Sequence, residues 1–312
     1  MNPYGLTYGS SPDLELVKTA LDKIRDEQVL LNARTGKATA EDPVVFTQDV
    51  ATNAAVVSTT QGAGGYFEKS TDDLKAAKNV NVNSPSPKTT LIATFRKNLK
   101  ISENFMADQQ HSSVAKAVRA NVSSWMASRD QNAFLVYANG FGTQDTIDGV
   151  DLFSNSHVND NNDTVDNLTT GALADATLNS AVVLLRNQKN QTGVKVGFEP
   201  DFLLTSNADH ANGMRVAKSV LRSGTGNNDL NYFSELFPGM KVVYNQFLDD
   251  TSTTAYFIGA QGHGVTRFVR QGLTTTLIPA NTQELDNHIY KLRAREEVDS
   301  IEYSGLVGST GA

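Results

Sequence analysis

The residues that could perform catalysis are either missing from this sequence or not arranged in a known catalytic pattern. The 312 residues include no cysteine, which excludes thiolate metal ligands, thiol nucleophiles and disulfides. The glycine cluster from Gly62 to Gly65 is not followed by the lysine–serine pair or the helix start of a phosphate-binding loop. No serine lies in the glycine-flanked turn of a nucleophile elbow. The sequence therefore predicts a protein that is not an enzyme.

Metal chemistry is the other possibility that individual residues raise. The segment from Asp160 to Asp166 offers several carboxylate and amide oxygens, which hard cations prefer. It lacks the central glycine and closing glutamate of a helix-loop-helix calcium site, so we interpret residues 155–167 as a flexible polar loop and leave ion binding there open. The histidines show no metal-ligand spacing, and His157 is expected to be a hydrogen-bonded structural residue. They are His111, His157, His210, His263 and His288. We expect no cofactor and no resident metal.

The charge balance is acidic. Lysine and arginine total 27, aspartate and glutamate total 34, and the formal net charge is −7. Such a molecule repels nucleic acid overall, so a dedicated DNA-binding protein is disfavoured. A container for DNA remains compatible, because a wall that held its cargo over the whole inner face would oppose packaging and release.

No segment resembles a signal peptide or a membrane span. The first residues lack a basic region followed by an apolar one. No later run approaches the roughly 20 apolar residues that a membrane-spanning helix needs. We expect a protein that is made and assembled in a cytoplasm and does not bind membranes.

The first hundred residues combine a helix with short β-prone pieces. Ser11, Pro12 and Asp13 form a helix start, and apolar residues recur on one face until about Asn32. Only about ten residues precede this helix, so no removable scaffolding segment is expected in front of the fold. Strands are predicted at 44–46, 54–60 and 89–99, and the pieces have too few large apolar residues to form their own core. A long hairpin that packs against something else is the favoured interpretation.

The remaining residues alternate between helical and strand patterns. Apolar spacing predicts a long helix over 112–139, about 40 Å at 1.5 Å per residue, with Gly140 as its stop. A second helix, capped by Asp175, is predicted to end near Gln188. Further predicted elements are strands at 202–205, near 242 and at 256–258, a helix at 208–221, a mobile loop at 224–228, and a long final strand at 285–297 before a tail rich in glycine and serine.

Several segments, in this order, resemble the Hong Kong 97-type major capsid proteins of tailed bacteriophages. More narrowly, they resemble the head subunits of Mu-like phages. No single segment is specific, but their order along most of the chain is. The segments are Lys88-Thr-Thr-Leu-Ile-Ala-Thr-Phe95, Lys100-Ile-Ser-Glu-Asn-Phe105, Asp148-Gly-Val-Asp-Leu-Phe-Ser-Asn-Ser-His157, residues 167–178, Pro200-Asp-Phe-Leu-Leu204, Arg293-Ala-Arg-Glu-Glu297 and Gly305-Leu-Val-Gly308.

This resemblance implies an α+β capsid fold. It places an N-terminal arm and helix at 1–40 and an extended β-hairpin loop with its flanking strands at 41–100. A peripheral domain at 101–174 would contain the spine helix, and an axial domain would occupy 175–271. Residues 272–312 would return to the peripheral domain and end in a tail.

The resemblance also implies a function. The protein would be a major capsid protein of the virion that self-assembles through pentamers and hexamers into an icosahedral shell enclosing double-stranded DNA. Its partners would be further copies of itself, portal and scaffolding proteins, and a decoration protein. Two alternatives stay open: the shell protein of an encapsulin-like cellular nanocompartment, and another phage structural protein such as a tail-tube or decoration protein.

Assembly residues follow from these assignments. The bend of the extended loop is assigned to Gly62, Gly64, Gly65, Tyr66 and Phe67, although an ordinary surface turn would look the same. The axial loop is assigned to Gly224 and Gly226. Lys291, Arg293 and Arg295 alternate along the last strand and would form a stripe that meets packaged DNA, an acidic neighbour or only solvent.

Some relatives join a loop lysine to a neighbour's asparagine by an isopeptide bond. The lysines available here are Lys69, Lys75, Lys78 and Lys88. None matches that chemistry residue by residue, and we expect no cross-link because exposed lysines are usually only solvated.

Overall fold

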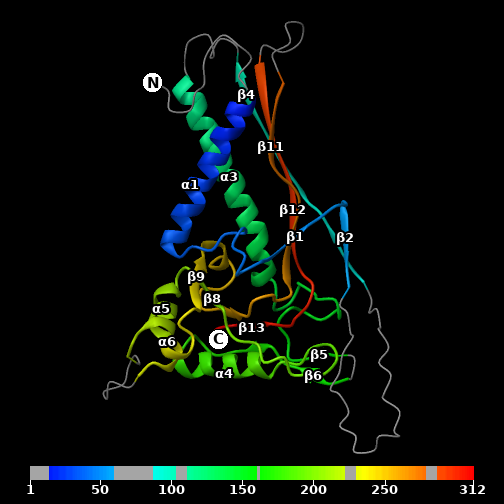
Figure 1. Ribbon diagram of the computed structural model, residues 1–312, viewed down its shortest axis with the longest axis vertical. Coiled ribbons are helices and arrows are strands. Elements are labelled where there is room, and N and C mark those ends of the chain that lie inside the picture. The colour runs from blue at the N-terminus through cyan, green and yellow to red at the C-terminus, as the bar shows by residue number, and fades with distance from the viewer. Residues whose placement is uncertain (1–13, 60–86, 103–110, 160–161, 222–229, 279–286) are drawn as a thin grey trace, which may run out of the picture.

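The computed structural model describes residues 14–59, 87–102, 111–159, 162–221, 230–278 and 287–312. Within this part, two larger sheets divide the molecule into a long body and a shorter one (Figure 1). The long body combines a four-stranded sheet with α1 and α3, and the shorter body combines a five-stranded sheet with α4, α5 and α6. The predicted α+β class is confirmed.

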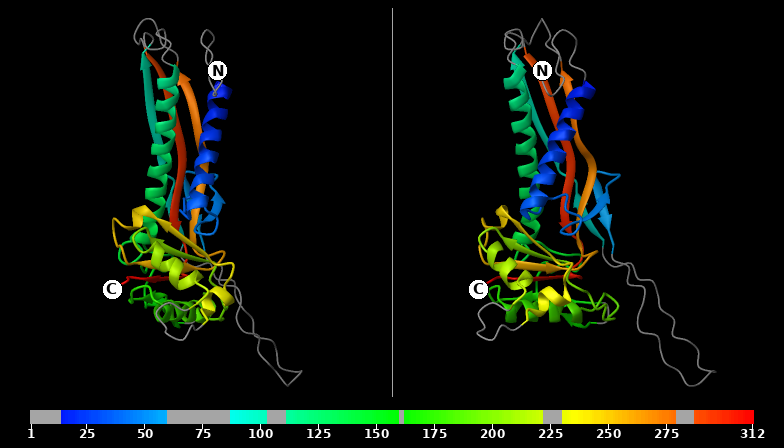
Figure 2. Two further views of the ribbon diagram at one scale, coloured as in Figure 1. Left: turned by 90° about the vertical axis from the view of Figure 1, so that its left-hand side faces the viewer. Right: turned by 60° about the vertical axis from the view of Figure 1, so that its left-hand side comes forward.

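The four-stranded sheet has the strand order β1-β11-β12-β4, and α1 and α3 pack beside it (Figure 2). β11 and β12 pair antiparallel, with irregularities in register between Val269 and Thr274. β4 pairs antiparallel with β12, and β1 pairs parallel with β11. The predicted final strand is confirmed as β12, whereas β11 was not predicted from the sequence. The bounds are β1 Thr47–Val50, β4 Thr94–Ser102, β11 Val265–Ile278 and β12 Asn287–Ser300.

The long predicted helix is confirmed to within one residue at each end, because α3 spans His111–Ala138. Its apolar side chains Val122 and Met126 are buried in a cluster with Tyr290 and Leu292 of β12. Gly140 follows the helix where a Cβ atom would lie 2.7 Å from the ring of Phe153. Only glycine lets the chain turn so close to that ring.

The first helix, α1, spans Leu14–Thr35 and ends three residues later than predicted. Gly36 follows it with a φ of +72°, a left-handed conformation that commonly ends helices and favours glycine. The amide of Lys37 then donates to the carbonyl of Asn32 at 3.1 Å. The helix therefore continues past Asn32 to Thr35 and stops before Gly36, which can adopt the left-handed conformation that turns the chain.

Two strand predictions in the first hundred residues are wrong. Residues 44–46 form a turn, in which the amide of Val44 donates to the Asp42 side chain at 3.0 Å, and the strand begins only at Thr47. The apolar residues there are core residues, since Val45 and Phe46 are fully buried. This is an Asx turn that carries hydrophobic side chains into the core.

The predicted strand 89–99 is two strands. β3 (Lys88–Leu91) pairs antiparallel with β2 (Ala55–Ser58), whereas β4 pairs with β12. The chain changes sheets at buried Ile92, which packs with Ala51 and Phe268. One run of alternating residues therefore contains strands of two different sheets. Its periodicity does not show where one strand ends and the next begins.

The five-stranded sheet has the order β7-β13-β10-β8-β9. Its predicted strands at 202–205, near 242 and at 256–258 are confirmed. Its core includes fully buried Leu178, Leu203, Phe233 and Ile258. The bounds are α4 Asp175–Asn187, α5 His210–Lys218, α6 Tyr232–Leu236, β7 Leu168–Thr169, β8 Phe202–Ser206, β9 Lys241–Asn245, a 3₁₀ turn Gln246–Leu248, β10 Tyr256–Gly259 and β13 Leu306–Ser309.

Three details of this body correct the sequence-based expectations. The cap of α4 is Ala174, and Asp175 is its first helical residue. α5 is shorter than the predicted helix, because the Asn231 side chain donates to the carbonyl of Val216 at 2.7 Å and so takes a helix-terminal acceptor. The predicted tail contains β13, which is buried in the sheet between β10 and β7.

His263 lies in the connection between β10 of one sheet and β11 of the other. Its ring is within hydrogen-bond reach of the Val44 carbonyl at 3.2 Å, and the Val265 amide donates to its Nδ1 at 3.2 Å. Burial lowers the pKa of His263 from 6.5 to about 4, although its hydrogen bonds to the backbone act in the opposite direction. The folded protein therefore holds this ring neutral at a position that joins the two bodies.

This histidine should make folding sensitive to acid. Between pH 6.5 and about 4 the unfolded chain binds a proton that the folded chain does not. The free energy of unfolding should therefore fall as pH falls through this window, by up to about 1.4 kcal/mol per pH unit. Denaturant titrations of the dispersed subunit at several pH values measure it. His263→Gln should flatten this part of the profile; an unchanged slope would contradict the assignment.

Candidate assembly surfaces

Most of the assembly residues that the sequence suggests lie outside the described residues. Those of the extended loop are Gly62, Gly64, Gly65, Tyr66 and Phe67, and those of the axial loop are Gly224 and Gly226. Arg293 and Arg295 are described, and both lie on β12. The residues that alternate with Lys291, Arg293 and Arg295 along β12 are buried: Tyr290, Leu292 and Ala294. The three basic residues therefore lie on the face of the sheet opposite to this core.

One carboxylate ties the β2–β3 pair to the long body. The Nζ of Lys88, the first residue of β3, lies 2.6 Å from Asp299 at the end of β12. The Thr90 hydroxyl donates to the other oxygen of Asp299, and the Gln144 amide donates to the first at 2.8 Å. The β2–β3 pair is thus fixed through a buried, charge-assisted network rather than through a core of its own.

The same contacts bear on covalent cross-linking. Besides Asp299, the Lys88 Nζ donates to the carbonyls of Asp145 and Ser300, each at 2.7 Å. These three acceptors match the three donors of an ammonium group. Because every donor of Lys88 is engaged within its own subunit, Lys88 has a structural role, and we expect no isopeptide bond from it.

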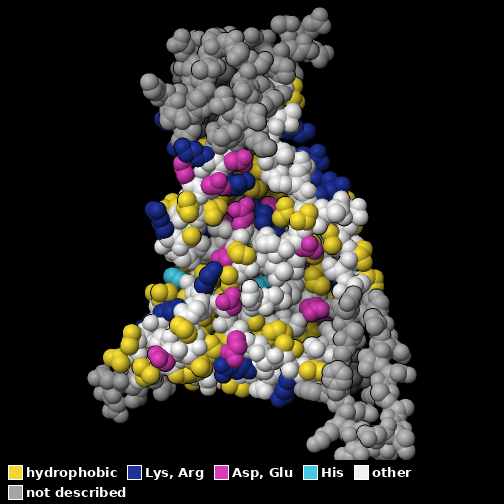
Figure 3. Space-filling model, viewed as in Figure 1, with side chains coloured by type: hydrophobic (Ala, Val, Ile, Leu, Met, Phe, Trp, Pro, Cys, Tyr) yellow, Lys and Arg dark blue, Asp and Glu magenta, His cyan; other side chains and the backbone are white. Residues whose placement is uncertain are grey.

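Two exposed apolar surfaces lie on opposite flanks of the molecule (Figures 1 and 3). The first, which we call the hairpin-base surface, consists of Val50 on β1, Val57 on β2 and Leu91 on β3, which are 76%, 60% and 73% exposed. The second, the α5–α6 surface, lies around the two short helices. Its residues are Met214, Val220, Leu221, Leu230, Tyr232 and Leu236. Apolar groups gathered in this way mark interaction sites rather than random exposure.

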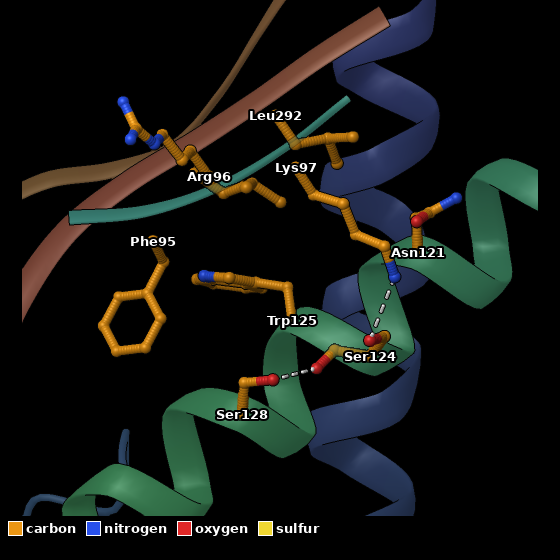
Figure 4. Close-up of a pocket in the computed structure, with 9 residues that line it drawn as sticks. Phe95, Arg96, Lys97, Asn121, Ser124, Trp125, Ser128 and Leu292 are labelled. Atoms are coloured by element: carbon orange, nitrogen blue, oxygen red, sulfur yellow. Dashed lines mark hydrogen bonds between the residues drawn. The ribbon is translucent and has the colours of Figure 1, made fainter. Parts of the chain in front are cut away.

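A small groove separates α3 from β4, and Phe95, Trp125 and Leu292 line it (Figure 4). Its volume is about 100 Å³, well below the roughly 300–1,000 Å³ of small-molecule sites. The Arg129 guanidinium lies 4.8 Å from the centre of the Trp125 ring, and Lys97 contacts Ser124 at 3.4 Å. The groove has room for a side chain but not for a drug-sized ligand.

The described residues of the polar loop at 155–167 include a short antiparallel ladder of β5 (His157–Val158) and β6 (Thr164–Val165). Lys189 pairs with Asp163 at 2.9 Å. In the described ranges, no group of three or more His, Asp or Glu side chains could hold a metal ion.

His157 is a buried structural residue, as predicted. Its Nδ1 lies 2.8 Å from Asp148, and its ring stacks on Tyr303 with centroids 4.3 Å apart. Burial alone would raise the pKa of Asp148, but hydrogen bonds from His157 and Thr146 hold it below its usual value. This cluster ties the loop to the chain just before β13.

Removing the Asp299 carboxylate should loosen the β2–β3 pair from the long body. Asp299→Asn leaves the mostly buried Lys88 ammonium without its counter-ion, so the free energy of unfolding should fall by about 3 kcal/mol. Amide hydrogen exchange of β2 and β3 should rise before that of β12. The double variant Lys88→Met/Asp299→Asn should lose less than the sum of the single variants, and additive losses would show that the pair is not coupled.

Comparisons with known proteins agree with this architecture. A family model described as phage capsid protein matches residues 87–307, which is more than half of the chain. The chain matches no curated protein sequence. Among the described residues, no helix has the length and apolar character of a membrane span.

Solved structures share the fold at low sequence identity. A protein of Microbacterium phage Oxtober96 has a TM-score of 0.54 at 14% identity over 88% of this chain and 91% of its own. A virus-like particle protein from Pyrococcus furiosus has a TM-score of 0.54 at 8% identity, over 94% and 97%. An encapsulin from Synechococcus elongatus has a TM-score of 0.50 at 12% identity, over 86% and 85%.

The fold is therefore the Hong Kong 97-type capsid fold, in which the sequence resemblance had placed the chain. The family match decides between a phage capsid and the other proteins that share this fold. The chain belongs to the phage capsid protein family, and it is a structural protein of the virion shell rather than an enzyme.

Proposed function

We propose that this capsid protein builds its icosahedral shell from head-to-tail rings, pentamers and hexamers, that enclose double-stranded DNA. The observation that carries the proposal is the pair of apolar surfaces on opposite flanks. Because the two surfaces lie on opposite flanks, they cannot meet within one subunit, and one two-fold contact cannot cover both. When the hairpin-base surface of one copy meets the α5–α6 surface of the next, the contact is heterologous, and a rotation that closes makes it a ring.

The two bodies fit the domains of such a ring. The four-stranded sheet with α3 would be the peripheral domain, and the five-stranded sheet with α4, α5 and α6 would be the axial domain. β11 runs through the sequence boundary at 271–272, and β13 returns the chain to the five-stranded sheet. On this assignment the chain passes between the domains twice after β10, which would couple their movements during assembly.

A finer assignment within the family rests only on the capsid-like sequence segments and their order along the chain. They support a place near the head subunits of Mu-like phages, with a portal protein, a separate scaffolding protein and a decoration protein as further partners. The sequence left a nanocompartment shell open as an alternative, and the family match favours the phage capsid over it. Sequencing the nucleic acid and identifying the proteins inside isolated particles discriminates the two.

Charges on the hairpin-base surface should prevent assembly without unfolding the subunit. Val57→Asp/Leu91→Asp places carboxylates at exposed positions, so the melting temperature should change little while negative-stain microscopy shows no closed particles. Val183→Asp, an exposed valine of α4 outside both surfaces, is the matched control and should assemble. Normal shells from the double variant would exclude this surface as an interface.

Assembled shells should dissociate completely in hot detergent. Lys88 donates to three acceptors of its own subunit, and no lysine matches the cross-linking chemistry of some relatives, so non-covalent contacts alone should join the subunits. Boiled particles should give a single band at the mass of one chain, 33.7 kDa. A ladder of heavier bands would contradict the prediction.

A further inference from the structure

The four-stranded sheet has an uncovered face that is strongly basic. Arg96 and Lys100 of β4 and Lys291, Arg293 and Arg295 of β12 lie on it, and we call these five residues the basic sheet face. Arg293 lies directly opposite Arg96 in the strand register, and Lys291 opposite Asn98. In Figure 3 lysine and arginine side chains gather at this edge of the molecule, where Figure 1 places β4 and β12.

These cations have no counter-ion among the described residues. The nearest carboxylates along β12 are engaged elsewhere: Glu296 forms a buried pair with Arg267, and Glu297 accepts a hydrogen bond from Asn132 at 2.6 Å. The Nε atom of Arg295 is shielded from solvent and has no hydrogen-bond acceptor. Burial, followed by the charges of Arg270 and Arg293, lowers the pKa of Arg295.

Such an arrangement is unfavourable in an isolated subunit. Like charges directly opposite each other on neighbouring strands destabilise a sheet, and a shielded guanidinium nitrogen without an acceptor loses hydration that nothing replaces. A partner that brings several oxygens with negative charge would remove both costs, because arginine binds carboxylate and phosphate groups with its planar fork.

Carboxylates of another copy fit this face better than phosphates of DNA. Five cations on every subunit, repeated over a whole shell, would bind the phosphate backbone strongly enough to oppose packaging and release. The chain itself supplies the opposite charge: it has a net charge of −7 in spite of this face, and the segment from Asp145 to Asp166 contains six aspartates and no lysine or arginine. Of these six, Asp148 and Asp163 are already paired within the subunit, with His157 and Lys189. Self-association therefore brings a complementary surface to every basic face.

We propose that the basic sheet face is an inter-subunit docking surface, which the carboxylates of a second copy neutralise when the shell forms. The inference rests on the proposed assembly into a shell and adds a second, electrostatic contact to the apolar one. Lys100, Arg96, Arg293 and Arg295 would each pair with an acid of the neighbour, and contact would supply the missing acceptor at Arg295.

Charge reversal on this face tests the proposal. Arg293→Glu/Arg295→Glu should keep the thermal melting of the free subunit within a few degrees, yet reduce the yield of particles at least tenfold. The matched control is Lys23→Glu/Lys116→Glu, which makes the same charge change at exposed positions of α1 and α3 and should assemble like the wild type. Arg293→Lys/Arg295→Lys, which keeps the charge, should retain assembly that fails at lower salt concentrations than in the wild type.

Zero-length cross-linking between amines and carboxylates identifies the partner directly. In shells assembled from an equal mixture of isotope-labelled and unlabelled subunits, Lys291 or Lys100 should be joined to an acidic peptide of the other isotope composition. The product should be absent from dispersed subunits. Links only within one subunit, or none, would overturn the proposal.

Two other outcomes are separable. If the charge-reversed protein assembles normally but its particles hold less DNA, the basic face meets phosphate and the proposed docking is wrong. If the wild-type chain itself forms no particles under any condition tested, the proposed function fails before the docking surface is in question.

Discussion

The long antiparallel pair of β11 and β12 is the interaction on which the rest of the subunit depends. It extends from the junction with the five-stranded sheet to the far end of the long body, and β1 pairs with β11 while β4 pairs with β12. α3 packs on the inner face of β12, and the Asp299 network that fixes the β2–β3 pair lies at the end of β12. Loss of this pairing would separate the elements that the capsid fold holds together.

Charged side chains in the interior are paired with counter-ions, whereas Arg293 and Arg295 on the uncovered face of this sheet have none among the described residues. Inside, Arg267 lies against Glu296, and Arg129 contacts Glu41 at 2.6 Å and neighbouring Asp130 at 3.4 Å. Such pairs must be complete, because an uncompensated buried charge is costly. The absence of a counter-ion around Arg293 and Arg295 in the described part therefore contrasts with these interior pairs, as expected for a surface completed by another chain.

The β2–β3 pair also has one face covered by its own subunit and one face left exposed. The β2–β3 pair has one inner face with Val56, packed near Phe268, and one outer face with Val57 and Leu91 exposed. A two-stranded ladder is marginal by itself, so it gains stability either from the body below it or from a neighbour above it. The subunit uses the body for one face, and we infer that the shell supplies a cover for the other.

The sequence by itself determined the long helix, the final strand, the alternation of the arginine stripe and the order of capsid-like segments, because these depend on periodicity and local residue type. Tertiary structure decided what periodicity cannot distinguish. The apolar residues Val45 and Phe46 became a buried turn, and the run 89–99 became strands of two sheets. Lys88, one of four candidate lysines, became the centre of a structural network. The buried turn begins with a local contact of Val44 with Asp42, but Asp299, the partner of Lys88, and the strand partners of residues 94–99 lie on β12, far away in the chain, and sequence spacing carries no record of them.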